Sequence, residues 1–166
     1  LGESTWKLND TARVVGGLRL DYHEATDARG IVAVGMGTVP NPTAGHERSE
    51  TLPSAFIRYE RDLDRDLSVY VAAGHTERFP DYWELFSKES PTSISAFNTN
   101  PEKTTQVDIG LTRRLEQTLV SISLFVNRID DFILIESRFE KPAIGGIRQA
   151  LISRSVDAAT WGGEAT

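Results

Sequence analysis

Cysteine is absent from this sequence of 166 residues, which excludes disulfide bonds, thiol catalysis and cysteine-type zinc sites. No apolar run approaches the ~18 residues of a membrane-spanning helix. Basic residues are outnumbered, with 18 against 24 acidic ones, and the resulting net charge of −6 argues against nucleic acid as a partner. The hydrophobic share of 39% is nevertheless too high for a disordered chain, and the length suits about one domain.

Signatures of catalysis are missing as well. The sequence contains no Ser-His-Asp pattern, nucleophile elbow, P-loop or dinucleotide-binding glycine motif, so we expect no enzyme. It begins at Leu1 without a basic and apolar leader, and it ends at Thr166 inside a predicted strand. We therefore expect a fragment of a longer protein, without a signal peptide in these residues.

Period-two alternation dominates the sequence, whereas helical periodicity is scarce. Within residues 104–115, for example, Val107 and Ile109 point one way while Gln106 and Asp108 point the other. The same pattern predicts strands at residues 17–22, 54–61, 67–76, 104–115 and 119–127, with weaker ones at 4–8 and 153–161. The fold class is therefore all-β, with about seven strands.

The predicted connections alternate between short and long. Residues 9–10, 62–66 and 116–117 are brief polar turns of the hairpin type. Residues 23–50, 78–103 and 138–149 are long links rich in glycine and proline. In an antiparallel up-and-down meander every second connection lies at the same end of the sheet. This rhythm is typical of bacterial outer-membrane barrels, whose turns are short at one end and whose loops are long at the other.

Two fold classes share this alternation. A transmembrane β-strand needs only about 9–11 residues, with an apolar face toward lipid and a polar face toward the lumen, so a mean hydropathy of −0.30 is compatible with a barrel. A soluble antiparallel sandwich gives the same pattern. Phe56 and Phe125 break the alternation, because each places an aromatic ring on the polar side. The pattern alone leaves both classes open.

The residues themselves resemble a known family at three places, which are residues 74–85, 100–111 and 123–133. There a strand runs into Arg78-Phe79-Pro80, Pro101-Glu102-Lys103 launches the next strand, and an aromatic-rich strand ends near an aspartate followed by an apolar pair. This order is similar to the β-barrel of TonB-dependent outer-membrane receptors. Residues 155–164 are similar to the family's following strand, although Ser155 stands where Asn is usual.

Within that family, residues 78–86 and 100–106 most resemble the TonB-dependent copper receptors. The resemblance implies that residues 1–166 are part of a large transmembrane β-barrel of about 22 strands around a plug domain, with neither plug nor TonB-box in these residues. It implies a cell outer-membrane receptor, surrounded by lipid, that takes up copper, a metal chelate or a siderophore with energy from the TonB complex. The alternative function is a secreted soluble β-domain that binds glycans or proteins through its loops.

No bound cofactor is expected, and copper enters only as a transported substrate. His23, Met36 and His46 share the first long link or its edge, and imidazole and thioether are ligands that suit copper. They could meet at the rim as a metal site, or they could be solvated loop residues. The sequence leaves both interpretations open.

A second candidate site follows the strand that ends at Arg78-Phe79-Pro80. Proline ends the strand because it cannot donate to the ladder. Tyr82 and Trp83 follow directly and, with Arg78, form the candidate set. They could belong to an aromatic girdle at the membrane interface, which is the general rule in such barrels, or they could line a ligand vestibule.

Overall fold

A computed structural model describes residues 2–166, in which nine strands and one short helix are formed. The elements are β1 (Gly2–Asn9), β2 (Ala12–Thr26), β3 (Ile31–Val34), β4 (Gly37–Pro40), β5 (Glu47–Asp62), β6 (Leu67–Arg78), α1 (Tyr82–Phe86), β7 (Glu102–Leu115), β8 (Thr118–Ala143) and β9 (Gly146–Ala165). Within these residues, no helix is long and apolar enough to cross a membrane.

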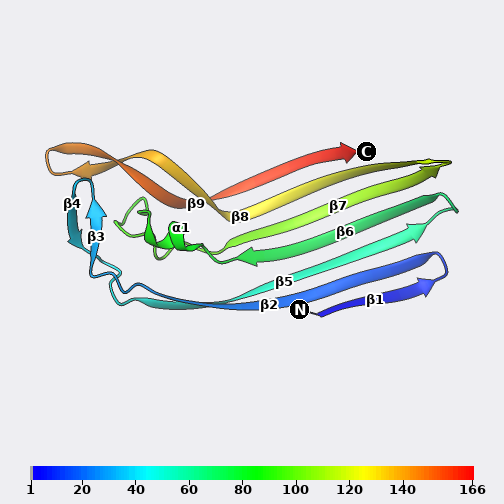
Figure 1. The fold of residues 1–166 in the computed structure, drawn as a ribbon, viewed down its shortest axis with the longest axis horizontal. Coiled ribbons are helices and arrows are strands. Elements are labelled where there is room, and N and C mark those ends of the chain that lie inside the picture. The colour runs from blue at the N-terminus through cyan, green and yellow to red at the C-terminus, as the bar shows by residue number, and fades with distance from the viewer. Residues whose placement is uncertain (1) are drawn as a thin grey trace.

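Seven of the strands form one antiparallel sheet in the order β1-β2-β5-β6-β7-β8-β9, and β3 pairs with β4 as a separate hairpin (Figure 1). Apart from that inserted hairpin, every strand pairs with its neighbour in sequence. The predicted up-and-down meander of about seven strands is confirmed, including the two weaker strands at the ends. The sheet has two open edges, at β1 and β9, and does not close into a barrel within these residues.

The predicted alternation of connections holds for the first two long links and fails for the third. Residues 27–46 and 79–101 are long links at one end of the sheet, whereas the turns at 10–11, 63–66 and 116–117 lie at the other end (Figure 1). The expected loop at 138–149 is wrong, because β8 and β9 continue through it as a hairpin. Its turn is formed by Ile144 and Gly145, and Gly145 has φ +91°, a conformation that glycine adopts without strain.

The register sorts side chains onto two unlike faces, since directly paired residues point to the same side of an antiparallel sheet. One row runs across five strands through Ile57, Ala73, Val107, Val126 and Trp161. Val107 is 43% exposed and Trp161 is 85% exposed. This apolar face is therefore uncovered by any described residue, which a soluble sandwich would not tolerate.

The buried residues gather at the end of the sheet that carries the long links. Residues 27–46, 79–101 and the upper β8–β9 hairpin (136–153) fold together there, and we call this unit the cap. Its buried apolar side chains, together with those at the adjoining ends of the strands, are Val32, Leu52, Leu85, Ala96, Phe97, Ile133, Ala150 and Ile152. The packed core of the described chain thus belongs mainly to the cap, and the sheet below it is a single layer.

Candidate functional site

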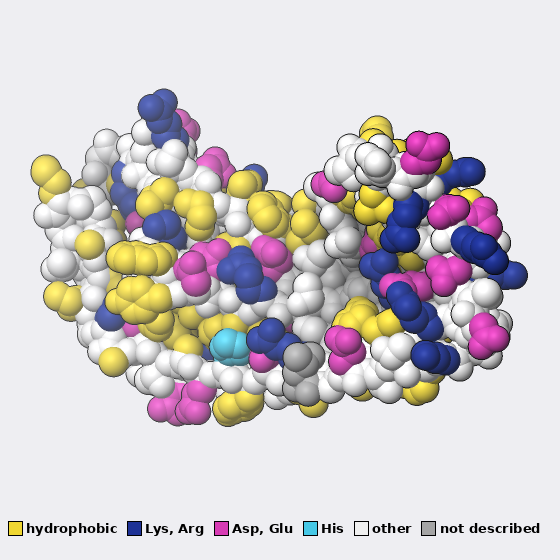
Figure 2. Space-filling view, turned by 45° about the vertical axis from the view of Figure 1, so that its right-hand side comes forward, with side chains coloured by type: hydrophobic (Ala, Val, Ile, Leu, Met, Phe, Trp, Pro, Cys, Tyr) yellow, Lys and Arg dark blue, Asp and Glu magenta, His cyan; other side chains and the backbone are white. Residues whose placement is uncertain are grey.

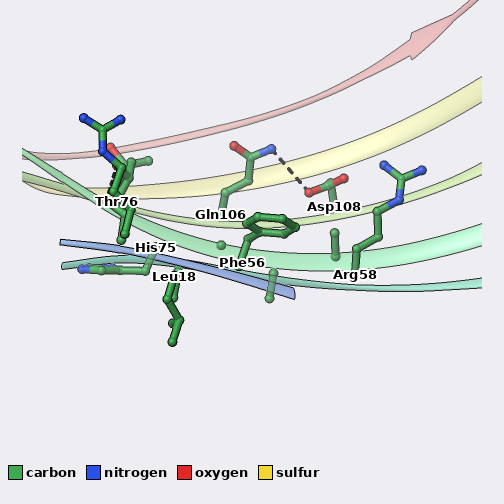
Figure 3. A pocket seen from close by; sticks show the side chains of 15 residues that line it. Leu18, Phe56, Arg58, His75, Thr76, Gln106 and Asp108 are labelled. Atoms are coloured by element: carbon green, nitrogen blue, oxygen red, sulfur yellow. Dashed lines mark hydrogen bonds between the residues drawn. The ribbon is translucent and has the colours of Figure 1, made fainter. Parts of the chain in front are cut away.

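The polar face of the sheet carries a shallow hollow of about 500 Å³. Figure 3 shows Phe56, Arg58, Gln106 and Asp108 on one side of the strands, with Leu18 pointing to the opposite side. Small residues, among them Gly17, Ala72 and Gly74, contribute to the lining of the hollow. The space-filling view also shows a hollowed surface between the two ends of the molecule (Figure 2). We call this hollowed polar face, which carries Phe56, Arg58, Gln106 and Asp108, the polar wall. A polar wall suits the wet interior of a barrel.

Charged groups on this wall are held in place by one another. The Arg58 Nε atom lies 2.6 Å from Glu60 Oε1, and its guanidinium lies 3.9 Å from the centroid of the Tyr70 ring. Arg13 forms an ion pair with the same Glu60 carboxylate. Further along the wall, the Gln106 amide donates to Asp108 at 3.5 Å. The wall is therefore polar and ordered, but its charges are largely satisfied by neighbours.

The structure explains why two aromatic residues, Phe56 and Phe125, lie on the polar side of their strands. Phe56 is the direct cross-strand partner of Gly17, and Phe125 is that of Gly162. Each ring covers its glycine so closely that a Cβ atom there would lie under 3.0 Å from ring carbon atoms. The rings therefore lie along the wall, over glycine, and the polar face accommodates them.

A buried polar network centred on Asp27 joins the first two long links. The fully buried Asp27 carboxylate accepts hydrogen bonds from Arg29 Nη2 at 2.7 Å and from Thr43 Oγ1 at 2.7 Å. Arg29 also donates to the Phe86 carbonyl and to Ser95 Oγ, both on the second link. Burial alone would raise the pKa of Asp27, but the bonds from Arg29, Thr43 and Asn41 outweigh it and hold that pKa well below its usual range.

A second network fastens the second link to the β8–β9 hairpin. The buried Glu89 carboxylate lies 2.7 Å from Lys141 Nζ and accepts two bonds from Arg148, at 2.8 and 2.6 Å. Lys141 Nζ also donates to the Ser90 and Ser93 carbonyls, so its three donors are used. Burial raises the pKa of Glu89, but the bonds from Arg148 and Lys141 lower it by more. The pKa of Glu89 is therefore below its ordinary value.

The three predicted metal ligands lie at different places around the cap. His23 lies within β2, with its ring stacked on Phe79 at a centroid distance of 5.2 Å. Met36 is fully exposed in the turn of the β3–β4 hairpin. His46 is exposed directly before β5, and its main-chain carbonyl accepts from the Asp27 amide. Within residues 2–166, no three His, Cys, Asp or Glu side chains are grouped to hold a metal ion.

The second predicted set lies where β6 meets α1. Arg78 ends β6 and binds Glu84 at 2.9 Å and Glu102 at 3.3 Å. Tyr82 and Trp83 open the helix, stay 65% and 66% exposed, and contact each other edge to face at 5.6 Å. The helix begins at this point because the Asp81 and Glu84 side chains form a reciprocal capping box. The two rings are therefore placed on the cap by local capping and by the Arg78 ion pairs.

The residues that hold the cap together were not found by sequence reasoning. Asp27, Arg29, Glu89, Lys141 and Arg148 are scattered over the chain, and Arg148 is separated from Glu89 by 59 positions. No short motif marks them. Isolated charged residues in links are ordinarily solvated, and only the folded cap shows that Asp27, Glu89 and Lys141 are buried and that Arg29 and Arg148 are half-buried partners of these carboxylates.

Comparisons with known proteins agree with this architecture. The family model described as "TonB dependent receptor-like, beta-barrel" matches residues 2–165. A search of the curated proteins gave no significant match. Among solved structures, the chain is similar to one described as "Copper transporter OprC", with a TM-score of 0.84 and 41% sequence identity over 98% of the chain. The chain spans 25% of that protein's length. These residues therefore belong to the TonB-dependent receptor family, as part of its β-barrel domain.

Proposed function

We propose that the receptor containing this chain imports copper across the outer membrane, with energy delivered by the TonB complex. The observation that carries the proposal is the 41% identity to a copper transporter along nearly the whole chain. The uncovered apolar face supports a lipid environment, and the polar wall supports a position at the lumen. No observation favours the alternative of a secreted soluble binding domain.

An uptake assay tests this function. The full receptor is expressed in cells that lack it, and cell-associated copper is measured under copper limitation, with and without an intact TonB complex. We expect the receptor to raise copper uptake only when TonB is present. Equal uptake in cells with and without the receptor would refute copper transport. Supplying copper as the free ion and as a chelate would show which form is carried.

We further propose that His23, Met36 and His46 present soft and imidazole ligands to arriving copper at the rim. The exposure of Met36 and His46 supports this role, since a transient ligand has to be reachable from solution. Replacing all three by alanine in the full receptor should weaken copper uptake. Unchanged uptake at equal receptor level would dismiss this rim as a ligand donor. The triple variant Thr38→Ala, Thr51→Ala and Glu47→Ala is the control.

Arg78, Tyr82 and Trp83 are proposed to line the vestibule above the lumen. The location of α1 in the cap and the exposure of both rings support this role. The Trp83→Ala variant should weaken substrate capture without changing receptor level. The Trp161→Ala variant on the apolar face is the matched control and should leave capture intact. Equal effects of the two variants would favour a girdle role instead.

A further inference from the structure

Two exposed arginines lie on the apolar face of the sheet, at the end opposite the cap. Arg61 follows Ile57 on β5, and Arg113 follows Val107 on β7, each an even number of positions further along its strand. Side chains alternate between the faces of a strand, and neither strand has a bulge in its pairing with β6. Both arginines therefore point to the same side as these apolar residues, near the short turns (Figure 1).

This part of the apolar face lies in the middle of the sheet. Arg61 is on β5, which pairs with β2 and β6, and Arg113 is on β7, which pairs with β6 and β8. Further strands of a barrel continue the sheet from β1 and β9, and a plug fills the lumen, so neither covers the outer side of β5 to β7. The exposure of the two arginines is thus a property of the barrel wall.

The spacing of charges along β7 corresponds to the thickness of a membrane. The outward row carries Lys103 toward the cap and Arg113 toward the short turns, and the four outward side chains between them are uncharged. The ten positions from one to the other span ~34 Å along the strand. At a strand tilt of about 40° this is ~26 Å along the membrane normal, close to the ~25 Å apolar band of outer-membrane barrels. Arg113 therefore lies at the level of lipid headgroups.

The chain itself gives neither arginine a carboxylate partner. Most arginines of the chain form ion pairs, but within residues 2–166 no ion pair includes Arg61 or Arg113. The carboxylates of the adjacent turn are directed elsewhere. Asp62 lines a hollow that Glu60 also lines, and Asp64 Oδ1 accepts from the Asp66 main-chain N–H at 2.7 Å. Both guanidinium groups thus require an anion from outside the described chain.

The surface between the two arginines is apolar. Val69 is the direct partner of Arg61, Leu67 is that of Arg113, and both apolar side chains belong to β6. The strands β5 and β7 lie two strand spacings apart, at ~9.6 Å, with β6 between them. We call Arg61, Leu67, Val69 and Arg113 the lipid-side patch. It combines an apolar floor, which suits an acyl chain, with two guanidinium groups, which bind phosphate oxygens in a bidentate manner.

We propose that the lipid-side patch binds the headgroup phosphate of an anionic phospholipid in the periplasmic leaflet of the outer membrane. Short turns mark the periplasmic end of a barrel, which gives the leaflet. The charge of the two arginines and the apolar floor together fit a lipid, whereas a free anion would use the charge alone. This inference rests on the barrel position of the sheet and is independent of which substrate the receptor carries.

The test uses the purified, delipidated full receptor in detergent and native mass spectrometry, which counts bound lipid molecules. Phosphatidylglycerol and diacylglycerol with the same acyl chains are the probes, because they differ in the headgroup phosphate. We expect the receptor to retain phosphatidylglycerol under activation that removes diacylglycerol. The Arg61→Gln/Arg113→Gln double variant should retain one phosphatidylglycerol molecule fewer, and Arg113→Gln alone should weaken its retention about fivefold.

A matched double variant removes the same charges from other surfaces. Arg65→Gln/Arg114→Gln changes the turn and the polar side of β7, and it should keep the lipid count of the unchanged receptor. Arg61→Lys/Arg113→Lys keeps both charges and should restore most of the retention. Mobility with and without heating verifies that each variant is a folded barrel.

Three results would overturn the proposal. The first is an unchanged lipid count in both Arg113→Gln and the Arg61→Gln/Arg113→Gln variant. The second is an equal loss in the Arg65→Gln/Arg114→Gln control, and the third is equal retention of diacylglycerol and phosphatidylglycerol. Displacement of the bound lipid by inorganic phosphate would also contradict it, because the guanidinium groups would then bind a free anion instead.

Discussion

The ring of Tyr70 on β6 lies over Gly110, its direct cross-strand partner on β7. Arg58 covers the other side of this arrangement, with its guanidinium 3.9 Å from the ring centroid. The ring is thereby confined between a cation and a bare stretch of backbone. This pair repeats the relationship of Phe56 with Gly17 and of Phe125 with Gly162.

Adding one methyl group under the Tyr70 ring should therefore destabilise the sheet. Gly110→Ala places a Cβ atom against that ring and is expected to cost about 1–3 kcal/mol through overpacking, even though alanine is the better strand former. Gly74→Ala is the control, because the nearest atoms to its Cβ would lie at an ordinary 3.7 Å. Urea unfolding of the full receptor in detergent measures both, and equal midpoints would contradict the prediction.

Breaking the Asp27 network should loosen the cap without unfolding the sheet. Asp27→Asn removes the charge that pairs with Arg29 and is expected to cost about 2–3 kcal/mol of local stability. Asp21→Asn breaks an ion pair with the exposed Arg19 and should cost about 0–1 kcal/mol. Hydrogen exchange of residues 27–46 reports the difference. If residues 27–46 are equally protected from exchange in both variants, the Asp27 network does not hold this link in place.

The cap should keep its stability from neutral pH down to about pH 5 and lose it only in stronger acid. Asp27 and Glu89 both have pKa values below their ordinary ones, so their stabilising contribution is present above the pKa of the unfolded chain and is lost as the pH falls through the folded-state pKa values. Hydrogen exchange of the cap between pH 7 and pH 3 checks this. In the Asp27→Asn variant, the stability of the cap should depend less on pH. If the cap already loosens near pH 6, Asp27 and Glu89 are not the groups that stabilise it.

Two neighbouring positions on β7 separate the lipid face from the lumen face. Val107→Arg places a charge on the uncovered apolar face and should cost about 2–4 kcal/mol near the middle of the bilayer. Gln106→Arg places the same side chain on the polar wall beside Asp108 and should be tolerated. Folding of the full receptor into lipid vesicles, followed by its electrophoretic mobility with and without heating, measures both. Equal tolerance would contradict a membrane-spanning β7.

Sequence reasoning was most successful where one physical rule acts along the whole strand. Alternation located all seven strands of the sheet, because each of them separates an apolar from a polar face. It predicted too short a strand for β8, at residues 119–127, whereas β8 extends over Thr118–Ala143. Beyond residue 135 the β8–β9 hairpin belongs to the cap. There neither strand needs a continuous apolar face, so the alternation weakens. Glycines at 145 and 146 then suggested a loop, although they form a tight turn.

The cap could not be derived in the same way. The contacts of Arg29 with Ser95 and of Lys141 with Glu89 join segments separated by 66 and 52 positions. Neither residue lies in a spacing that suggests a partner. Local patterns predict which residues are extended, but they do not predict which links fold against one another. The candidate ligands His23, Met36 and His46 stay a prediction for the same reason.

Surface loops of a barrel ordinarily change length and sequence independently of one another. The Asp27 and Glu89 networks remove that independence, because each link supplies the counter-charge or the main-chain acceptor that another link requires. An insertion or deletion in one of the three segments would separate Glu89 from Lys141 and Arg148, or Arg29 from the Phe86 carbonyl. In evolution and in engineering, these segments should therefore be inherited, exchanged or grafted as a single module.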